Sequence, residues 1–281
     1  TMDLLVHMFD KNLRSHITRK RITRNDPKFD TLLVSIAQDP RSKQSITAAV
    51  DIAEVGRDIG RNTNLKDLSL DDLHCLDHTD IVLSAWMFNL LCEGINENKS
   101  IQSLTVSNFS HNQWQLGHFL RPFLANNPSL RSMCVMTGGG YTRSAENMRL
   151  LVSPLLERDD PLGELCFIEN AVNDEMVCVL VDEFLKNPSL APKKLQIAAC
   201  GFGFAGCQAL AKLLKSPSCT TETLDISDNY IEDDGAACLA EALVMNNTLS
   251  ELSLEGNRIT TKGWRAFSSV TCFVRRQHER L

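Results

Sequence analysis

The sequence predicts an α/β solenoid with a parallel inner sheet, outer helices and about eight strand-helix repeats. The first observation behind this prediction is an apolar residue that recurs at intervals of 28 to 36 positions. The second is another apolar residue two positions after each of these. A unit with a single apolar side cannot bury that side alone, so neighbouring units must stack. We call the recurring residues the central positions of the repeats, and they are Leu32, Leu68, Leu104, Met133, Leu165, Leu195, Leu224 and Leu252.

Each central position lies in a short segment that predicts a strand with one buried face. Apolar residues at the central position and two residues later alternate with other residue types, as side chains alternate between the faces of a strand. An apolar residue also stands three positions before six of the eight central positions, with Pro192 and Thr221 as the exceptions. The residues two positions after the centres are Val34, Leu70, Val106, Val135, Phe167, Ile197, Ile226 and Leu254.

The turn after the strand carries a polar signal in the last four repeats. Five residues after the central position, asparagine or cysteine can satisfy backbone groups as the chain turns away. These four residues are Asn170, Cys200, Asn229 and Asn257, and the corresponding residues of three earlier repeats are Leu73, Phe109 and Gly138. The N-terminal half is therefore expected to be a degenerate form of the repeat.

A helix is expected behind each strand, because apolar residues there recur three and four positions apart. Two repeats show this spacing clearly, in Val177, Leu180, Val181 and Phe184 and in Ala236, Leu239, Ala240 and Leu243. A strand followed by a helix, repeated along the chain, places parallel strands on an inner curve and helices outside it.

Phrases such as AACLAEALVMNNTLSELSLEGNRIT resemble the ribonuclease-inhibitor-like subclass of leucine-rich repeats. Similar units occur in NOD-like immune receptors, in Ran GTPase-activating proteins and in tropomodulin. The resemblance covers residues 29–270, and its motif is specific from about residue 160 onward. It implies a non-enzymatic, curved platform for protein partners.

The ends of the chain are expected to differ from residues 29–270, the solenoid. Residues 1–28 carry seven Lys or Arg against three Asp. One interpretation is an address tag or a handle for an acidic partner, nucleic acid included. We favour a helical cap over the first repeat, buried through Leu4, Leu5, Met8, Phe9 and Leu13. No aromatic residues are interleaved with this run, so nucleic acid is not the expected partner. Residues 271–281 are expected to form a polar cap or tail.

The composition fits a folded chain inside the cell. Of its 281 residues, 43% are hydrophobic and 23% are charged. The longest nearly apolar run, Ile81 to Leu91, is about half of the roughly 20 residues that a membrane-spanning helix needs. No secretory leader follows Thr1. Several of the ten cysteines stand where a small apolar side chain would pack, which is typical of thiols in a reducing compartment. We therefore expect free thiols and a cytoplasmic location.

Three motifs offer chemistry, and none is expected to perform it. Gly201, Gly203 and Gly206 match the dinucleotide fingerprint G-x-G-x-x-G, but Gly206 belongs to the repeat, because Gly235 and Gly263 occupy the same position in later units. The run Gly138 to Gly140 lacks the Lys and Ser/Thr of a phosphate-binding loop. A loop with His74, Cys75, Asp77, His78 and Asp80 lacks a second ligand cluster. No catalytic, cofactor-binding or metal-binding residues are predicted, and no cofactor is expected.

The candidate site is the inner, concave face. Residues one before, one after and three after each central position alternate with the buried ones and should point there. The middle of this face is apolar, while acidic residues such as Asp67 and Asp71 mark its flanks, so we expect a protein partner with a basic surface. The alternative is that the chain's own segments cover Met136 and Ile168. The candidate residues are Cys134, Met136, Glu164, Cys166, Ile168, Gln196, Asp225, Glu251 and Glu255.

Three classes of function fit this surface. We favour a non-enzymatic platform for protein-protein interaction, because a curved sheet offers an extended surface and no enclosed pocket. The resemblance also allows a GTPase-regulating role of the Ran type, although no arginine of this chain aligns with that role. The third class is a structural subunit of a larger complex.

Overall fold

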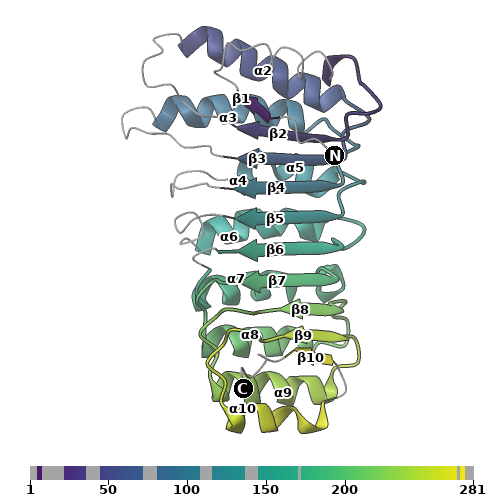
Figure 1. Ribbon diagram of the computed structural model, residues 1–281. Coiled ribbons are helices and arrows are strands. Elements are labelled where there is room, and N and C mark those ends of the chain that lie inside the picture. The colour runs from purple at the N-terminus through teal and green to yellow at the C-terminus, as the bar shows by residue number, and fades with distance from the viewer. Residues whose placement is uncertain are drawn as a thin grey trace.

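Ten parallel strands form one sheet in sequence order, from β1 to β10, in a computed structural model of the protein (Figure 1). The structure describes residues 5–7, 22–35, 45–71, 81–107, 116–136, 145–169, 172–270 and 273–275. The strands are β1 (Leu5–His7), β2 (Thr31–Ser35), β3 (Asp67–Asp71), β4 (Ser103–Ser107), β5 (Ser132–Met136), β6 (Glu164–Ile168), β7 (Lys194–Ala198), β8 (Thr223–Asp225), β9 (Glu251–Ser253) and β10 (Phe273–Arg275).

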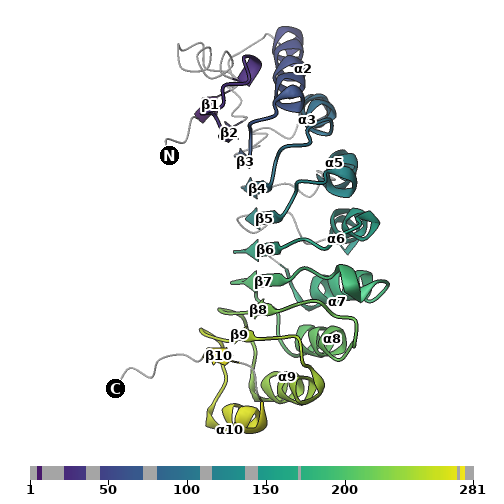
Figure 2. The same cartoon turned by 90° about the vertical axis from the view of Figure 1, so that its right-hand side faces the viewer.

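The helices lie in a single layer on one side of this sheet, and the opposite side of the sheet is the inner face of a gently curved solenoid (Figure 2). The α-helices are α2 (Ser45–Arg61), α3 (Ile81–Ile95), α4 (Leu116–Phe119), α5 (Arg121–Asn126), α6 (Ala145–Val152), α7 (Asp174–Phe184), α8 (Phe204–Leu214), α9 (Asp233–Met245) and α10 (Thr261–Arg265). Three short 3-10 helices accompany them, η1 (Ser153–Glu157), η2 (Pro188–Leu190) and η3 (Ala266–Ser269).

The central positions form a continuous buried ladder, as the sequence predicts. Each is paired in register with the next along the sheet, from Leu32 opposite Leu68 to Leu224 opposite Leu252. All eight, and all eight residues two positions later, are at most 1% exposed. Pro192 and Thr221 replace the apolar residue three positions before the centre in their repeats. They contact each other, because the Thr221 hydroxyl donates a 2.9 Å hydrogen bond to the Pro192 carbonyl. The predicted solenoid is confirmed.

Both ends of the sheet extend one strand beyond the prediction. Leu5–His7 is a strand paired with β2, so a helix is the wrong expectation for this part of residues 1–28. Phe273–Arg275 likewise pairs with β9, inside the expected tail. An edge strand leaves a row of unpaired backbone N–H and C=O groups, and a further parallel strand satisfies them. Val6 lies opposite Val34, and Val274 lies opposite Leu252.

Helices α2 and α3 approach each other closely because glycines line their contact. Gly56 and Gly60 are four residues apart on α2, so they share one helix face. Both face Gly94 of α3: a Cβ on Gly60 would lie 2.2 Å from the Gly94 oxygen, and one on Gly94 would lie 2.0 Å from the Gly56 carbonyl carbon. The two backbones are therefore in direct contact.

A ladder of buried asparagines, which the sequence analysis missed, supports the turns that enter the strands. Asn62, Asn98 and Asn127 are at most 2% exposed. Each side-chain oxygen accepts hydrogen bonds from the backbone N–H groups two and three residues later. Each amide group donates to a carbonyl of the preceding unit. The N-terminal half thus has its own polar ladder at the opposite end of the strands.

Arg158 continues this ladder in the next unit with different chemistry. Arg158 is 9% exposed. Its guanidinium donates hydrogen bonds to the carbonyl oxygens of Leu124, Asn127 and Leu130 at 2.9, 3.1 and 2.9 Å. Burial lowers the pKa of Arg158 from its ordinary value, and the neighbouring Arg131 acts in the same direction. The positively charged Arg158 therefore satisfies backbone carbonyl groups of α5 and of the turn that follows this helix.

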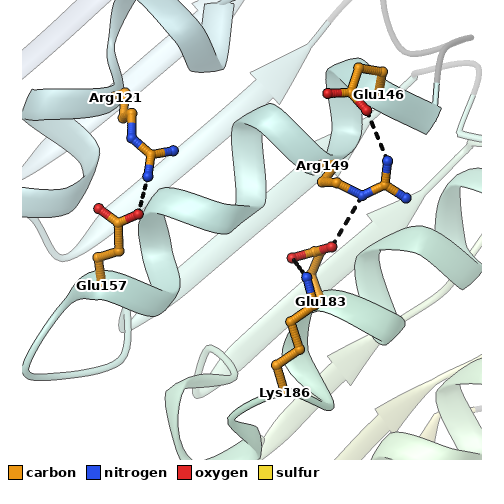
Figure 3. A network of polar contacts seen from close by, with 6 residues as sticks. All are labelled: Arg121, Glu146, Arg149, Glu157, Glu183 and Lys186. Carbon is orange, nitrogen blue, oxygen red and sulfur yellow. Dashed lines mark hydrogen bonds and ion pairs between the residues drawn. The ribbon is translucent and has the colours of Figure 1, made fainter.

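An ionic network joins neighbouring helices on the outer side (Figure 3). Glu183 of α7 is 3% exposed and accepts hydrogen bonds from Arg149 of α6 at 3.3 Å and from Lys186 at 2.6 Å. Arg149 also pairs with Glu146 of its own helix at 2.8 Å. A buried carboxylate needs such partners, so the network links α6 to α7.

No helix among the described residues is long and apolar enough to cross a membrane.

Candidate functional site: the concave face

The side chains on the open side of the sheet form three rows across the strands, because the parallel strands pair without a shift in register. We call this surface the concave face. Its first row holds residues one before the central positions, its second row residues one after, and its third row residues three after. In β5 these are Ser132, Cys134 and Met136, opposite Glu164, Cys166 and Ile168 of β6.

The third row is apolar across β5, β6 and β7. Met136, Ile168 and Ala198 lie opposite one another in β5, β6 and β7. Met136 is 37% exposed, and Ile168 is half-buried, so neither is sealed off from solvent. Ala198 is buried. A methionine presents a flexible, polarizable surface that adapts to a partner.

The first row is charged in β6 and β7. Glu164 of β6 and Lys194 of β7 lie opposite each other and form an ion pair at 2.5 Å, with Ser132 at 3.4 Å from the carboxylate. The hydrogen bond between them lowers the pKa of Glu164 and raises the pKa of Lys194. The pair therefore stays ionised around neutral pH, and is lost as the pH falls through the lowered pKa of Glu164. Lys194 obeys the same positional rule as the predicted residues, yet the sequence analysis overlooked it.

The second row holds two thiols in β5 and β6, and polar residues in β7 and β8. Cys134 and Cys166 lie opposite each other in β5 and β6. In the next two strands, Gln196 donates a 2.8 Å hydrogen bond to Asp225. Asp225 also accepts hydrogen bonds from the backbone and hydroxyl of Ser227, at 3.1 and 2.7 Å. These contacts hold the polar side chains in fixed orientations.

Acidic residues gather toward the C-terminal end of the concave face. Glu251 is half-buried and Glu255 is exposed, and Asp225 precedes them by one strand. Asp67 in β3 is exposed on the opposite flank. Asp71 also lies in β3, as expected.

The structure brings all nine predicted site residues onto or beside this one face, with one departure in exposure. Six of them are half-buried, Met136 and Glu255 are exposed, and Cys166 is only 4% exposed. The expectation that Cys166 presents its side chain to a partner is therefore wrong in the unbound protein. In the register of the sheet, Cys166 lies between Cys134 of β5 and Gln196 of β7.

Sequence comparisons match the chain to proteins that contain leucine-rich repeats. The family model "Leucine Rich repeat" matches residues 218–240 and 246–268. Ribonuclease inhibitor of Sus scrofa is 32% identical over 120 residues, which is 42% of this chain and 26% of that protein. The chain is built from leucine-rich repeats similar to those of ribonuclease inhibitor.

Two further matches fit this assignment. NACHT, LRR and PYD domains-containing protein 9 of Bos taurus is 35% identical over 92 residues, which is 33% of this leucine-rich repeat chain and 9% of that protein. The chain thus corresponds to a small part of its curated relatives. A solved protein from Bacteroides fragilis shares the fold, with a TM-score of 0.52 and 14% identity over 91% of this chain and 66% of that one.

The asparagine-or-cysteine position of the leucine-rich repeat performs its expected role beside the concave face. Cys200 is 7% exposed and donates through its thiol to the Ala198 carbonyl at 3.2 Å. Asn229 is 2% exposed and bonds to five backbone groups. Asn257 makes the same kind of bonds but is half-buried. Asn170 lies outside the described residues.

The glycine motif of this leucine-rich repeat protein binds the carboxylate of Asp174, a residue of the preceding repeat. The Asp174 Oδ1 accepts hydrogen bonds from the backbone N–H groups of Gly203 and Gly206, at 3.0 and 2.5 Å. A helix N-terminus attracts anions, and here Asp174 of α7 occupies that place at the start of α8. Asp233 of α9 does the same for α10, where it accepts from Thr260 and Gly263. The motif is a contact between repeats.

The other two motifs lie outside the described residues. This applies to Gly138 to Gly140 and to the loop with His74, Cys75, Asp77, His78 and Asp80. Within the part of the chain that the structure describes, no group of three or more His, Cys, Asp or Glu could hold a metal ion.

Proposed function

We propose that this protein is a non-enzymatic platform that binds a protein partner through its concave face, across strands β5 to β9. The observation that carries the proposal is the exposed Met136 beside half-buried Ile168, in an apolar row bordered by charged side chains. An apolar centre with a polar rim is the usual anatomy of a protein-protein interface. The names of the relatives support a protein-binding role in general.

The partner is expected to carry a basic surface. Lys194 is already paired with Glu164, whereas Glu255 is exposed at the C-terminal end of the concave face. Complementary charge steers association, and salt screens it. Capture of the partner should therefore weaken as the salt concentration rises. We place this binding inside the cell, in the cytoplasm, because the eight described cysteines are free thiols and several fill core positions.

Replacing both Met136 and Ile168 with glutamate is expected to abolish capture and leave folding intact, since both side chains face solvent at least in part. Losing an interface centre costs about 2 kcal/mol or more, which corresponds to a roughly 30-fold loss of affinity. The measurement is a crosslinking pull-down from the native source followed by mass spectrometry, with the melting temperature of each variant recorded.

The matched control places the same charges on the outer side. Val244 and Met245 of α9 are 58% and 79% exposed, so replacing both with glutamate adds equal charge away from the concave face. Proteins captured by the parent and by this control, but not by the Met136 and Ile168 variant, are the partners of the concave face. Equal capture by all three chains would remove this face as the site.

A further inference from the structure

The two thiols in the second row of the concave face are placed for chemistry with each other. Cys134 and Cys166 are register partners in neighbouring parallel strands, which run about 4.8 Å apart. Their side chains leave the sheet on the same side, and each thiol is the largest influence on the pKa of the other. A disulfide needs Cα atoms roughly 4.4 to 6.8 Å apart, so the two strands can be linked without moving apart.

We propose that Cys134 and Cys166 form a dithiol modification site at the centre of the concave face, which a low-molecular-weight disulfide of the glutathione class converts into a disulfide bond between β5 and β6. The proposal concerns the unbound protein and does not depend on the proposed partner.

The two thiols have different environments, and these assign them different roles. Cys134 is half-buried, whereas Cys166 is 4% exposed. The hydrogen bond with Cys166 lowers the pKa of Cys134, with help from the Lys194 ammonium and against the effects of burial and Glu164. The same hydrogen bond, together with burial, raises the pKa of Cys166. The reachable thiol is thus the one that ionises more readily, and the thiolate is the nucleophile.

The other half-buried cysteines of the described chain provide the contrast. Burial is the largest cause that raises the pKa of Cys178, and it also raises the pKa of Cys238. Both are half-buried like Cys134, and Cys178 donates its thiol to the Ala205 carbonyl at 3.9 Å, a contact that favours the thiol over the thiolate. Selectivity for Cys134 therefore follows from its partner.

The reaction proceeds in two exchanges. The Cys134 thiolate attacks one sulfur of oxidised glutathione, forms a mixed disulfide and releases glutathione thiolate. Cys134 then no longer accepts the hydrogen bond, so the main cause of the raised pKa of Cys166 is gone. The Cys166 thiolate attacks the Cys134 sulfur, breaks the mixed disulfide and releases the second glutathione thiolate. Two electrons pass to glutathione, and the two thiol protons end on the two glutathione molecules at neutral pH.

The test treats the full chain with oxidised glutathione, blocks the remaining thiols with N-ethylmaleimide and maps the peptides without reduction. Trypsin releases residues 132–143, with Cys134 as the sole cysteine, and cleavage after Glu169 separates Cys166 from Cys178. We expect a link between the Cys134 and Cys166 peptides. No such link under native conditions would overturn the proposal.

Single variants distinguish this mechanism from random oxidation. Cys166→Ser should halt the reaction at a stable glutathione adduct on Cys134. Cys134→Ser should leave Cys166 without an adduct, because Cys166 is almost inaccessible. Cys178→Ser and Cys238→Ser are the matched controls and should form the link as the parent does. An adduct on Cys166 in the folded Cys134→Ser variant, or faster modification of Cys178 or Cys238 than of Cys134, would contradict the assigned roles. Circular dichroism confirms that each variant is folded.

Discussion

Replacing Gly94 with alanine is expected to destabilise the fold, although the same change would stabilise an isolated helix. Alanine exceeds glycine in helix propensity by about 1 kcal/mol. In this protein, however, the new Cβ would stand 2.0 Å from the carbonyl carbon of Gly56 and 2.4 Å from the nitrogen of Arg57. Backbone atoms have no alternative rotamer, so α2 and α3 must separate.

Separation affects more than one atom pair, because Gly60 and Gly56 contact α3 at the same interface. Overpacking a core typically costs about 1 to 3 kcal/mol. Here the added methyl group would force α2 and α3 apart along their whole contact. We therefore expect a net loss of about 2 kcal/mol or more in the free energy of unfolding, measured by urea denaturation. Hydrogen exchange should localise the loss to α2, α3 and the adjacent repeats, because units of a solenoid couple to their neighbours.

The control is the preceding residue of the same helix. Glu93 is exposed on the same helix, so Glu93→Ala gains in helix propensity without entering the contact. Its effect should stay within about 0.5 kcal/mol. A Gly94→Ala variant as stable as the parent, or more stable, would mean that the helices do not meet through their backbones.

The repeat frame was predictable because burial imposes it on every unit. Leu32 to Leu252 had to share one face, and a parallel sheet of identical repeats leaves a single register in which they meet. The short end strands were not predictable. Leu5–His7 lies in a segment whose apolar spacing also fits a helix, and a few apolar residues cannot distinguish the two.

Much of the candidate site could also be read from the repeat frame, and its missing parts are of two kinds. Lys194 stands one residue before a central position, so the positional rule already contained it. The pairing of Cys134 with Cys166 follows from that rule as well, since both stand one residue after a central position. The Asp174 contacts at Gly203 and Gly206 are different. They depend on side-chain geometry between two repeats, which apolar periodicity does not encode.

The second large effect is expected at Asn229, whose side chain replaces water for five backbone groups. Its amide nitrogen donates to the carbonyls of Ile197, Ile226 and Ser227 at 2.7, 3.1 and 2.9 Å. Its oxygen accepts from the N–H groups of Cys200 and Gly201 at 3.1 and 2.8 Å. Asn229 is 2% exposed, so water cannot take over these bonds without opening the turn.

Asn229→Ala should therefore lower the free energy of unfolding by about 3 kcal/mol, at the upper end of the range for buried polar groups left without a partner. For a chain of this size the melting temperature should fall by roughly 5 to 10 °C. Asn257→Ala is the matched comparison. Asn257 bonds to the backbone in the same way, but it is half-buried, so water can reach its freed partners and the loss should be smaller.

The order of the two losses tests the physical cause. If the asparagine ladder stabilises the fold by satisfying buried backbone groups, the cost follows burial, and Asn229→Ala must be the more damaging change. Amide exchange at Cys200 and Gly201, which donate to Asn229, should accelerate in that variant. An Asn229→Ala chain that melts like the parent would show that the polar ladder of these repeats does not stabilise the turn, and that the apolar ladder beneath it is sufficient alone.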